Sequence, residues 1–288
     1  MAIEIPSIQW FPGHMAKTRR LITENLKQVD LVLEITDARI PQSSRNPELD
    51  NWVAGKPRII MLNKSDNADN ERTKQWLAYY KEKGIPALAC DCKTGTGVKD
   101  FMPLVRNVLS DVIAKREAKG MGGRAIRIMI VGIPNVGKSS FINRMSGSKR
   151  TKVEDRPGVT RGRQWVSLSK DLDLMDMPGV LWPKFEDPLV GEKLAFTGAV
   201  KDDVIDIELL AARLLQYLAE GYESRLKERY KLDTVEGLDG FELLEAVGRK
   251  RGMLISGGEV NTERAAITVV DEYRSGKLGK ITFEVPQK

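Results

Sequence analysis

The sequence is poor in the side chains that build disulfide frameworks and metal centres. Its 288 residues include two cysteines and one histidine, His14. Cys90 and Cys92 are two positions apart, and we expect their side chains to point to opposite sides if the segment is extended. The sequence therefore supports neither a disulfide framework nor a structural zinc site.

Long apolar runs are also lacking. No stretch approaches the roughly 18 apolar residues of a membrane span, and residues 1–14 have neither the basic start nor the long apolar stretch of a signal peptide. We therefore expect a cytoplasmic protein with no membrane partner. Charged residues make up 30% and hydrophobic residues 41%, as in an ordinary globular protein. The net charge of +6 is compatible with a polyanionic partner or with a solvated Lys-rich surface.

A glycine-bounded loop follows an apolar run in the middle of the chain. Residues 128–131 read as a strand, Gly132 and Gly137 bound the loop, and a helix is predicted to begin near Lys138. This is the G-x-x-x-x-G-K-[ST] pattern in its strand-loop-helix context. The glycines permit backbone angles that aim N–H groups at phosphate oxygens, with the positive end of the helix dipole behind them. We predict a nucleotide phosphate site in which Lys138 contacts the β- and γ-phosphates and the Ser139 hydroxyl binds Mg²⁺.

Strands alternate with helices around this loop. Apolar strands are predicted at 31–35, 58–62, 85–90, 128–131, 164–168 and 172–175, and helices at about 15–29, 69–83, 98–115 and 138–145. This alternation predicts an α/β fold with a doubly wound, mostly parallel sheet. Beyond Trp182 the alternation stops, and the sequence predicts helices at 189–199, 207–220, 241–251 and 262–274 with a short strand at 281–285. We therefore expect two domains, residues 1–182 and a smaller, helical domain of residues 183–288.

The motif Asn63-Lys64-Ser65-Asp66 follows the second predicted strand and indicates which base is bound. Guanine presents two donors on one edge, and the Asp66 carboxylate can accept from both; adenine lacks the exocyclic amino group of that edge. Asn63 can tie this loop to the phosphate loop, and the aliphatic part of Lys64 can lie over the base. Cys92 and Lys93 resemble a turn that supplies backbone contacts to guanine O6.

Two further loops carry candidate sensors of the γ-phosphate. Asp176 can hold Mg²⁺ through a water molecule, and the Gly179 N–H can reach the γ-phosphate. The Thr160 hydroxyl can bind the same metal ion, although Thr160 alone could also be an ordinary surface threonine. We expect GTP to order both loops and GDP to release them.

The base-reading loops precede the phosphate loop and the sensors, which is an unusual order. In this order, and in several further motifs, the sequence resembles the circularly permuted GTPases, in particular the bacterial factors that assemble the large ribosomal subunit. The motifs that carry the resemblance are Gln9-Trp10-Phe11-Pro12-Gly13-His14-Met15, Asp37-Ala38-Arg39-Ile40-Pro41, Ser44-Arg45-Asn46-Pro47 and Gly179-Val180-Leu181-Trp182-Pro183-Lys184-Phe185. The resemblance implies a GTP-hydrolysing P-loop domain and a C-terminal domain that binds ribosomal RNA.

The resemblance also implies cofactors and partners. K⁺ is expected as an activator held partly by Asn135, beside the Mg²⁺ of the nucleotide. The partners are GTP and GDP, the large ribosomal subunit, its RNA and its proteins, and the chain is expected to be a monomer away from the ribosome. Clusters of basic residues fit an RNA partner: residues 144–163 contain seven Lys or Arg and two acids, and residues 115–127 contain five and one.

Two other functions are compatible with parts of the sequence. A P-loop kinase acting on a small molecule would need an adenine pocket, and Asp66 argues against it. A GTP-dependent factor acting on tRNA or on the small subunit is not excluded by composition or by motif spacing. Only the resemblance favours the large subunit.

The catalytic group is the least determined part of the site. Many GTPases place a water-orienting glutamine after the sensor glycine, but Val180 stands there and cannot form a hydrogen bond. Chain direction brings the start of the 15–29 helix to the nucleotide side, and the resemblance implies that His14 acts in hydrolysis. A histidine that caps or packs the Trp10-Phe11 turn, or that contacts RNA, is the alternative. The predicted catalytic residues are therefore His14, Lys138, Thr160 and Gly179, and the predicted GTP-binding residues are Asn63, Lys64, Asp66, Cys92, Lys93, Asn135, Val136, Gly137, Lys138, Ser139, Ser140, Thr160 and Gly179.

Overall fold

The computed structural model describes residues 12–147, 164–182, 185 and 187–287. These residues form a six-stranded sheet with the strand order β3-β2-β1-β4-β6-β5. The strands are β1 (Leu31–Asp37), β2 (Arg58–Asn63), β3 (Ala87–Ala89), β4 (Ile126–Val131), β5 (Gln164–Ser169) and β6 (Leu172–Asp176).

The sheet is parallel except at one edge. β1 pairs with β2 and with β4, β2 pairs with β3, and β4 pairs with β6, all in parallel. β5 is antiparallel to β6, as expected for two strands joined by the short turn at residues 170–171. The expectation of a mostly parallel, doubly wound sheet is confirmed. β4 lies at its centre, and the loops after β1, β2, β3, β4 and β6 leave from the same edge.

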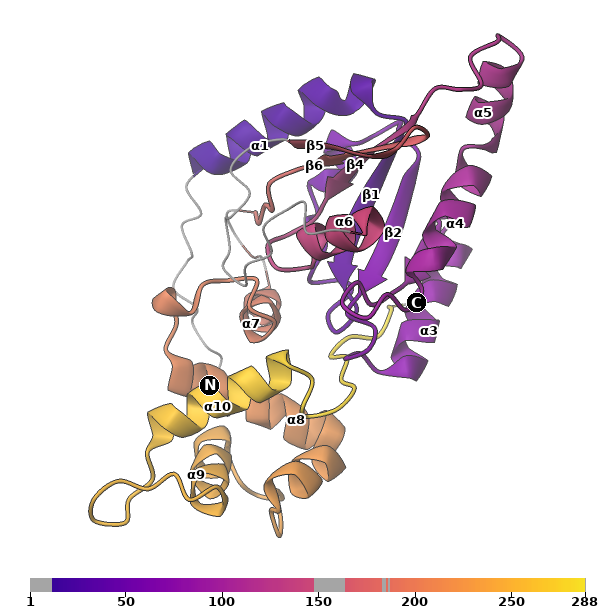
Figure 1. The fold of residues 1–288 in the computed structure, drawn as a ribbon. Coiled ribbons are helices and arrows are strands. Elements are labelled where there is room, and N and C mark those ends of the chain that lie inside the picture. The colour runs from indigo at the N-terminus through magenta and orange to yellow at the C-terminus, as the bar shows by residue number, and fades with distance from the viewer. Residues whose placement is uncertain (1–11, 148–163, 183–184, 186, 288) are drawn as a thin grey trace. The chain divides into compact units, whose positions relative to one another are not determined.

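Helices cover both faces of the sheet (Figure 1). The helices of this part are α1 (Pro12–Asn25), η1 (Leu26–Gln28), α2 (Leu49–Trp52), α3 (Asn70–Glu82), η2 (Val98–Asp100), α4 (Phe101–Val108), α5 (Ser110–Glu117) and α6 (Lys138–Ser146). On one face, Val32, Met129 and Met175 pack against Ile22 of α1 and Trp52 of α2. Crossovers that reverse direction along the sheet put α4, α5 and α6 on the other face.

The chain divides into two compact units. Among the described residues, the sheet unit comprises 12–147, 164–182 and 284–287, and the helical unit comprises 185 and 187–283. The helical unit contains α7 (Pro188–Phe196), η3 (Asp202–Val204), α8 (Ile207–Tyr230), α9 (Gly240–Lys250) and α10 (Thr262–Arg274).

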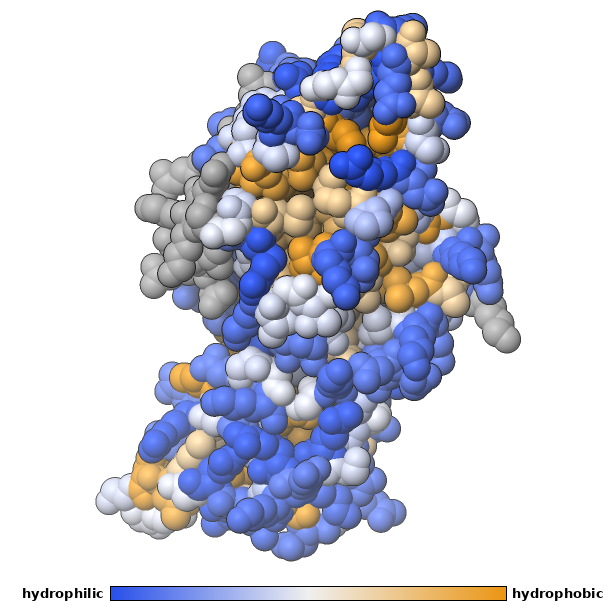
Figure 2. All heavy atoms as spheres, turned by 45° about the vertical axis from the view of Figure 1, so that its right-hand side comes forward, coloured by the Kyte–Doolittle hydropathy of each residue, from blue (hydrophilic) through white to orange (hydrophobic). Residues whose placement is uncertain are grey.

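The helices of the helical unit begin at side chains that accept hydrogen bonds from backbone N–H groups. Asp187, Asp206, Asp239 and Asn261 act in this way, and Asp239 forms a capping box with Glu242. The buried faces of α7, α8, α9 and α10 meet in one hydrophobic cluster. On the face shown in Figure 2, hydrophilic side chains cover most of the helical unit, whereas apolar side chains reach the surface over part of the sheet unit.

Three sequence expectations about local structure are wrong. The single helix predicted at 98–115 is divided into η2, α4 and α5, with a break at Leu109. α4 has buried side chains and α5 has none, so the break falls where the helix stops packing against the core. α8 continues beyond residue 220 to Tyr230, with a kink at Tyr222 (φ −147°, ψ 37°). Residues 281–285 pair with no described strand, since the backbone of Thr282 is bound by the Tyr222 hydroxyl instead.

No helix among the described residues is both long enough and apolar enough to cross a membrane.

Candidate nucleotide site

The loop after β4 wraps around the side chain of Lys138. Gly137 has φ +100°, a left-handed conformation that strains any residue with a Cβ, and α6 begins at the next residue. The Lys138 ammonium is buried and donates to the carbonyl oxygens of Gly132 and Ile133 at 3.1 and 2.9 Å. These are the backbone turn and the cation that a phosphate chain requires. Ser139 and Ser140 lie in the first turn of α6.

The loop after β6 lies against the same turn. A Cβ placed on Gly179 would come within 2.8 Å of Lys138 Nζ and 2.9 Å of the Pro134 nitrogen. The absence of a side chain at Gly179 therefore lets the two loops approach closely. The structure brings Gly179 and Lys138 together at one place.

Lys138 and Asp176 form a buried pair of opposite charges. Burial lowers the pKa of Lys138 to about 8, although the charge of Asp176 acts to raise it. Burial likewise raises the pKa of Asp176 to about 6, against the attraction of Lys138. One carboxylate oxygen of Asp176, Oδ1, is buried without a hydrogen-bond partner among the described residues.

This orphan oxygen fits a magnesium site of the predicted kind. A buried carboxylate oxygen with no donor is an acceptor for a metal-bound water molecule. Within the described part of the chain, no three His, Cys, Asp or Glu side chains cluster as a metal site. Mg²⁺ would accordingly take most of its ligands from phosphate oxygens and water. The residues present are compatible with such an ion.

Asn63 joins the base-reading loop to two other loops. Its Nδ2 donates to the carbonyl of Val136 at 2.6 Å, and its Oδ1 accepts from the N–H of Cys92 at 3.0 Å. A Cβ on Gly137 would collide with Asn63 Nδ2, so the glycine is needed for this approach. The expected connection from Asn63 to the phosphate loop is present.

Lys64 is held by a residue that the sequence analysis did not place in the site. Its Nζ forms an ion pair with Asp37 Oδ2 at 3.0 Å, and its φ of +60° turns the chain sharply after Asn63. Asp37 is buried and accepts from the backbone N–H, Nε and Nη2 of Arg39. The two nearby cations keep the pKa of Asp37 well below its usual range. Asp37 ends β1, so its position after a parallel strand was the signal that could have identified it.

Asp66, the predicted reader of guanine, is half-buried at the end of the same loop. Burial raises its pKa, and the negative charge of Asp91 adds to this effect. Asp91 in turn accepts from the N–H groups of Lys93 and Thr94 at 2.8 and 2.9 Å. The turn predicted to face guanine O6 is thus fixed from within by a carboxylate.

Arg144 fixes the same turn from α6 and was also missed. Its Nε donates to the Cys92 carbonyl at 3.1 Å, and its Nη2 donates to the Lys93 carbonyl. No sequence motif connects these positions. The side chain joins the helix that follows the phosphate loop to the loop that follows β3.

The cysteines do not point to opposite sides. The sulfur atoms of Cys90 and Cys92 lie 3.7 Å apart. The expectation is wrong because residues two positions apart in an extended segment lie on the same face, and not on opposite faces. Both are buried free thiols. The hydrogen bond to Cys90 and burial raise the pKa of Cys92, which keeps that thiol protonated.

The remaining predicted site residues are Asn135, Thr160 and His14. Asn135 has a left-handed φ of +59° within the phosphate loop. Thr160 lies outside the described residues. His14 lies in the first turn of α1, which begins at Pro12 rather than near Met15, and its side chain is outside the described part of the structure.

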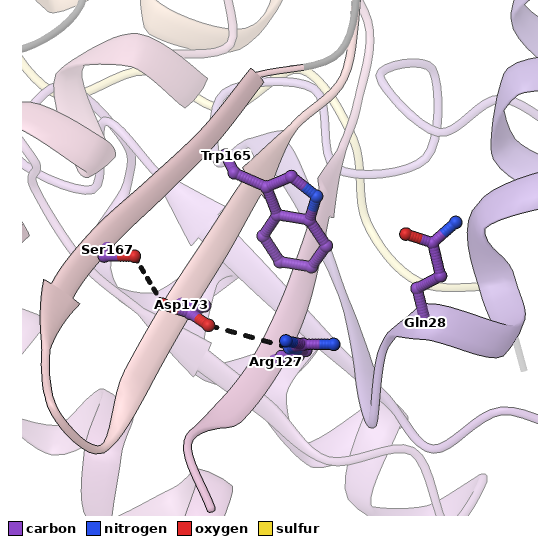
Figure 3. A pocket seen from close by; sticks show the side chains of 5 residues that line it. All are labelled: Gln28, Arg127, Trp165, Ser167 and Asp173. Carbon is purple, nitrogen blue, oxygen red and sulfur yellow. Dashed lines mark hydrogen bonds and ion pairs between the residues drawn. The ribbon is translucent and has the colours of Figure 1, made fainter.

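A shallow pocket of about 240 Å³ lies away from these loops (Figure 3). Arg127 and Asp173, near the starts of β4 and β6, form an ion pair at 3.6 Å, and the Arg127 guanidinium lies 5.5 Å from the centre of the Trp165 ring. Gln28 and Ser167 complete the lining. This pocket lies at the opposite end of the parallel strands from the phosphate loop and is not part of the nucleotide site.

Comparison with known proteins agrees with this geometry. A family model described as "50S ribosome-binding GTPase" matches residues 127–232. Ribosome biogenesis GTPase A of Priestia megaterium is 50% identical over 98% of both chains. The protein of the same name from Bacillus cereus is 48% identical over 98% of this chain and 95% of its own.

Solved structures extend the comparison to the fold. The GNP-bound YlqF from T. maritima has a TM-score of 0.66 and 28% identity, covering 94% of this chain and 99% of its own. The GDP-bound form gives the same TM-score and covers 93% of this chain. With a phosphate loop, a base-reading loop and a sensor loop on one sheet edge, and near-half identity along almost its whole length, the chain belongs to the ribosome biogenesis GTPase A family.

Proposed function

We propose that this GTPase is a switch that binds the maturing large ribosomal subunit and promotes a late assembly step. The observation that carries the proposal is the meeting of three loops at Asn63, whose amide connects the base-reading loop with Val136 and Cys92. The names of the relatives supply the ribosomal context.

In the proposed site, Asp66 accepts from guanine and the stem of Lys64 lies over the base. Asn135 to Ser140 surround the phosphates, with the Lys138 ammonium turned from the carbonyls of Gly132 and Ile133 to phosphate oxygens. The γ-phosphate is then sensed by the Gly179 N–H.

Mg²⁺ would be held by Ser139 and Thr160, and by Asp176 through water. When bound, the ion would supply positive charge that offsets the charge of the phosphates. K⁺ is proposed as an activator near Asn135, where a left-handed backbone conformation turns the loop.

RNA contacts are proposed for the helical domain and for the basic connector before β4. In the connector, Lys115, Lys119 and Arg124 are exposed. In the helical unit several cations are already paired with acids, such as Arg249 with Glu245 at 2.6 Å and Lys250 with Asp233 at 2.9 Å. These pairs leave less free positive charge there than the sequence alone suggests.

The test is GTP hydrolysis measured alone, with purified large subunits and with purified small subunits. We expect stimulation by the large subunit only, and tighter binding to it with a non-hydrolysable GTP analogue than with GDP in co-sedimentation at fixed salt. Stimulation by small subunits or by tRNA instead would show that the protein acts on those RNAs and not on the large subunit. Equal co-sedimentation in both nucleotide states would remove the switch from the mechanism. Light scattering would test whether the chain is a monomer when free.

A further inference from the structure

The loop at residues 38–45, which follows β1, is connected to the base-reading motif by both backbone and side chain. The N–H of Ala38 donates to the carbonyl of Asn63 at 2.8 Å. Asp37, at the start of the loop, forms the ion pair with Lys64 and is buried against Arg39. A displacement of this loop would therefore move the residues that read the base.

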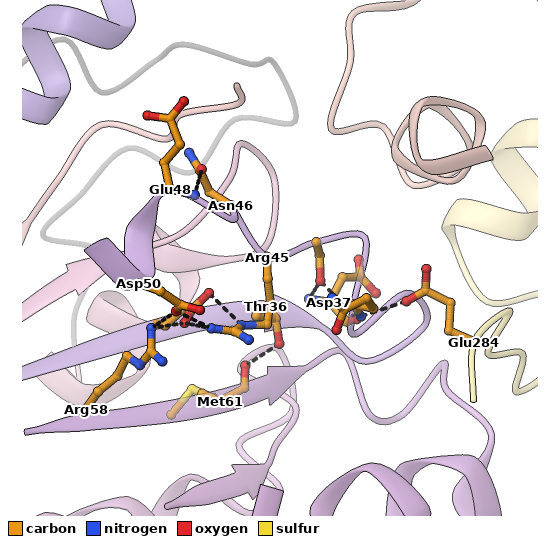
Figure 4. A network of polar contacts seen from close by, with 12 residues as sticks. Thr36, Asp37, Arg45, Asn46, Glu48, Asp50, Arg58, Met61 and Glu284 are labelled. Carbon is orange, nitrogen blue, oxygen red and sulfur yellow. Dashed lines mark hydrogen bonds and ion pairs between the residues drawn. The ribbon is translucent and has the colours of Figure 1, made fainter. Parts of the chain in front are cut away.

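A residue from the far end of the sequence holds the middle of this loop. The Glu284 carboxylate accepts from the backbone N–H groups of Gln42 and Ser43 at 2.7 and 3.1 Å, and from the Ser43 hydroxyl. In Figure 4 the Glu284 side chain points toward the loop that follows Asp37. The carboxylate is almost fully buried, with 7% of the residue exposed. Hydrogen bonds from several donors to a buried carboxylate are strong and are lost together when the carboxylate is removed.

The backbone of Glu284 contacts the other side of the base-reading motif. Its carbonyl accepts from Trp76 Nε1 at 3.2 Å, and Trp76 is buried on α3. α3 begins just after the motif, where Asp69 caps it. Glu284 thus bridges the loop that precedes β2 and the helix that follows Asp66.

The residue before Glu284 is fixed in the core of the helical unit. Phe283 packs against Phe196, Tyr217 and Tyr273, with ring centroids 5.5 to 5.7 Å apart. Thr282 is held by the Tyr222 hydroxyl through both its N–H and its carbonyl. Phe283 and Glu284 are consecutive residues, so the chain passes from one unit to the other at this peptide bond.

From these contacts we infer that Glu284 is a positioning residue for guanine binding, which holds the loop at residues 38–45 and, through it, the base-reading motif. The inference rests on the proposed guanine site. Glu284 does not touch the nucleotide in this scheme; it holds the 38–45 loop, so that Asp37 keeps Lys64 in place.

The test compares two ligands of the full chain. GDP requires the base-reading loop, whereas inorganic tripolyphosphate with Mg²⁺ requires only the phosphate loop. In Glu284→Ala we expect the Kd for GDP to rise about tenfold. The Ki of tripolyphosphate as a competitor of GDP should stay within twofold of its value for the unchanged protein. Glu284→Gln keeps one acceptor oxygen and should fall between Glu284→Ala and the unchanged protein. Val285→Ala, at an exposed neighbour in the same segment, should leave both constants unchanged.

The alternative outcomes are distinct. An unchanged Kd for GDP in Glu284→Ala would overturn the inference. A parallel loss of GDP and tripolyphosphate binding, or failure of both Glu284 variants to fold, would also overturn it, because Glu284 would then support the fold as a whole. Asp66→Asn, measured alongside, tests the guanine site itself. If Asp66→Asn changes nothing, the base assignment fails. If only the Glu284 variants change nothing, the guanine site stands and Glu284 is not a positioning residue for it.

Discussion

The side-chain amide of Asn63 donates to the carbonyl of Val136 at 2.6 Å, which joins the base-reading loop to the phosphate loop. The same amide accepts from the N–H of Cys92, so one residue fixes three loops that follow three different strands. Loops held in this way move together, and the two halves of the nucleotide site should gain or lose order as one unit.

Gly137→Ala should break this connection. The new Cβ would collide with Asn63 Nδ2, and φ of +100° strains any residue other than glycine. We expect GDP binding to weaken at least tenfold in an equilibrium titration. Gly147→Ala, at the other end of α6, is the matched control, because φ is +63° there but nothing lies within 4 Å of the new Cβ. It should cost about 1 kcal/mol of stability and leave GDP binding intact; similar losses of binding in both variants would contradict the role of Asn63.

Asp66→Asn should change the base preference from guanine to xanthine. The new amide can donate to the 2-oxo group of xanthine, whereas it no longer accepts both donors of guanine. The loss for GTP should be on the order of 1 to 3 kcal/mol, or about ten- to a hundredfold. A competition titration of GTP against xanthosine triphosphate measures it. An unchanged preference for GTP would show that Asp66 does not read the base.

Arg144→Met should loosen the turn at residues 92–93, which we propose faces guanine O6. The arginine donates to the carbonyls of both Cys92 and Lys93, and methionine preserves the apolar stem without these bonds. We expect faster dissociation of GDP, by roughly three- to tenfold if about 1 kcal/mol is lost, in a stopped-flow chase. Arg106→Met, at an exposed position of α4, serves as the control for loss of one positive charge. Equal effects of both substitutions would point to overall charge instead.

Asp176 should give the nucleotide-free protein an unusual pH dependence. Its pKa is raised to about 6, so between about pH 4 and pH 6 the folded state binds more protons than the unfolded state, and stability falls as pH rises. Asp176→Asn removes this contribution. The unfolding free energy of the variant relative to the unchanged protein should therefore increase by about 2 to 3 kcal/mol between pH 4 and pH 7. Urea titrations at the two pH values measure it, and a constant difference would show that burial does not perturb this carboxyl.

His14→Ala tests the proposed catalytic histidine. If His14 positions the attacking water, GTP binding and subunit binding should be nearly unchanged, while subunit-stimulated hydrolysis falls by about a hundredfold, as for loss of a general catalytic group. Single-turnover hydrolysis with saturating large subunits gives the rate. Gln28→Ala, at the other end of the same helical segment, should have no such effect. Undiminished stimulated turnover in His14→Ala would leave the histidine a structural or RNA-binding role.

Local patterns were sufficient for the architecture of the sheet and the phosphate loop. The spacing of Gly132, Gly137 and Lys138 specifies a strand-loop-helix unit, because few other sequences satisfy those backbone angles. The alternation of strands and helices determines the rest of the sheet, since crossovers have one hand. Asn63 could be connected to the phosphate loop because both follow parallel strands.

Contacts between distant residues of no fixed motif could not be predicted. Arg144 reaches the Cys92 carbonyl across 52 positions, and Glu284 reaches Ser43 across 241. Such contacts depend on loop conformations that tertiary packing selects. The prediction for the two cysteine sulfurs failed for a different reason, because side chains at i and i+2 of an extended segment share a face, which agrees with the short distance between the sulfurs.

The order of the strands has a consequence for the synthesis of the protein. Translation proceeds from the N-terminus, so β1, β2 and β3 leave the ribosome before β4, and β1 has an open edge until its central partner arrives. The carboxylate of Glu284 is added after all of these strands. The base-reading part of the nucleotide site is therefore translated first, but its contacts with Glu284 are completed last. A nascent chain should acquire an ordered guanine site only when nearly its whole length has been made.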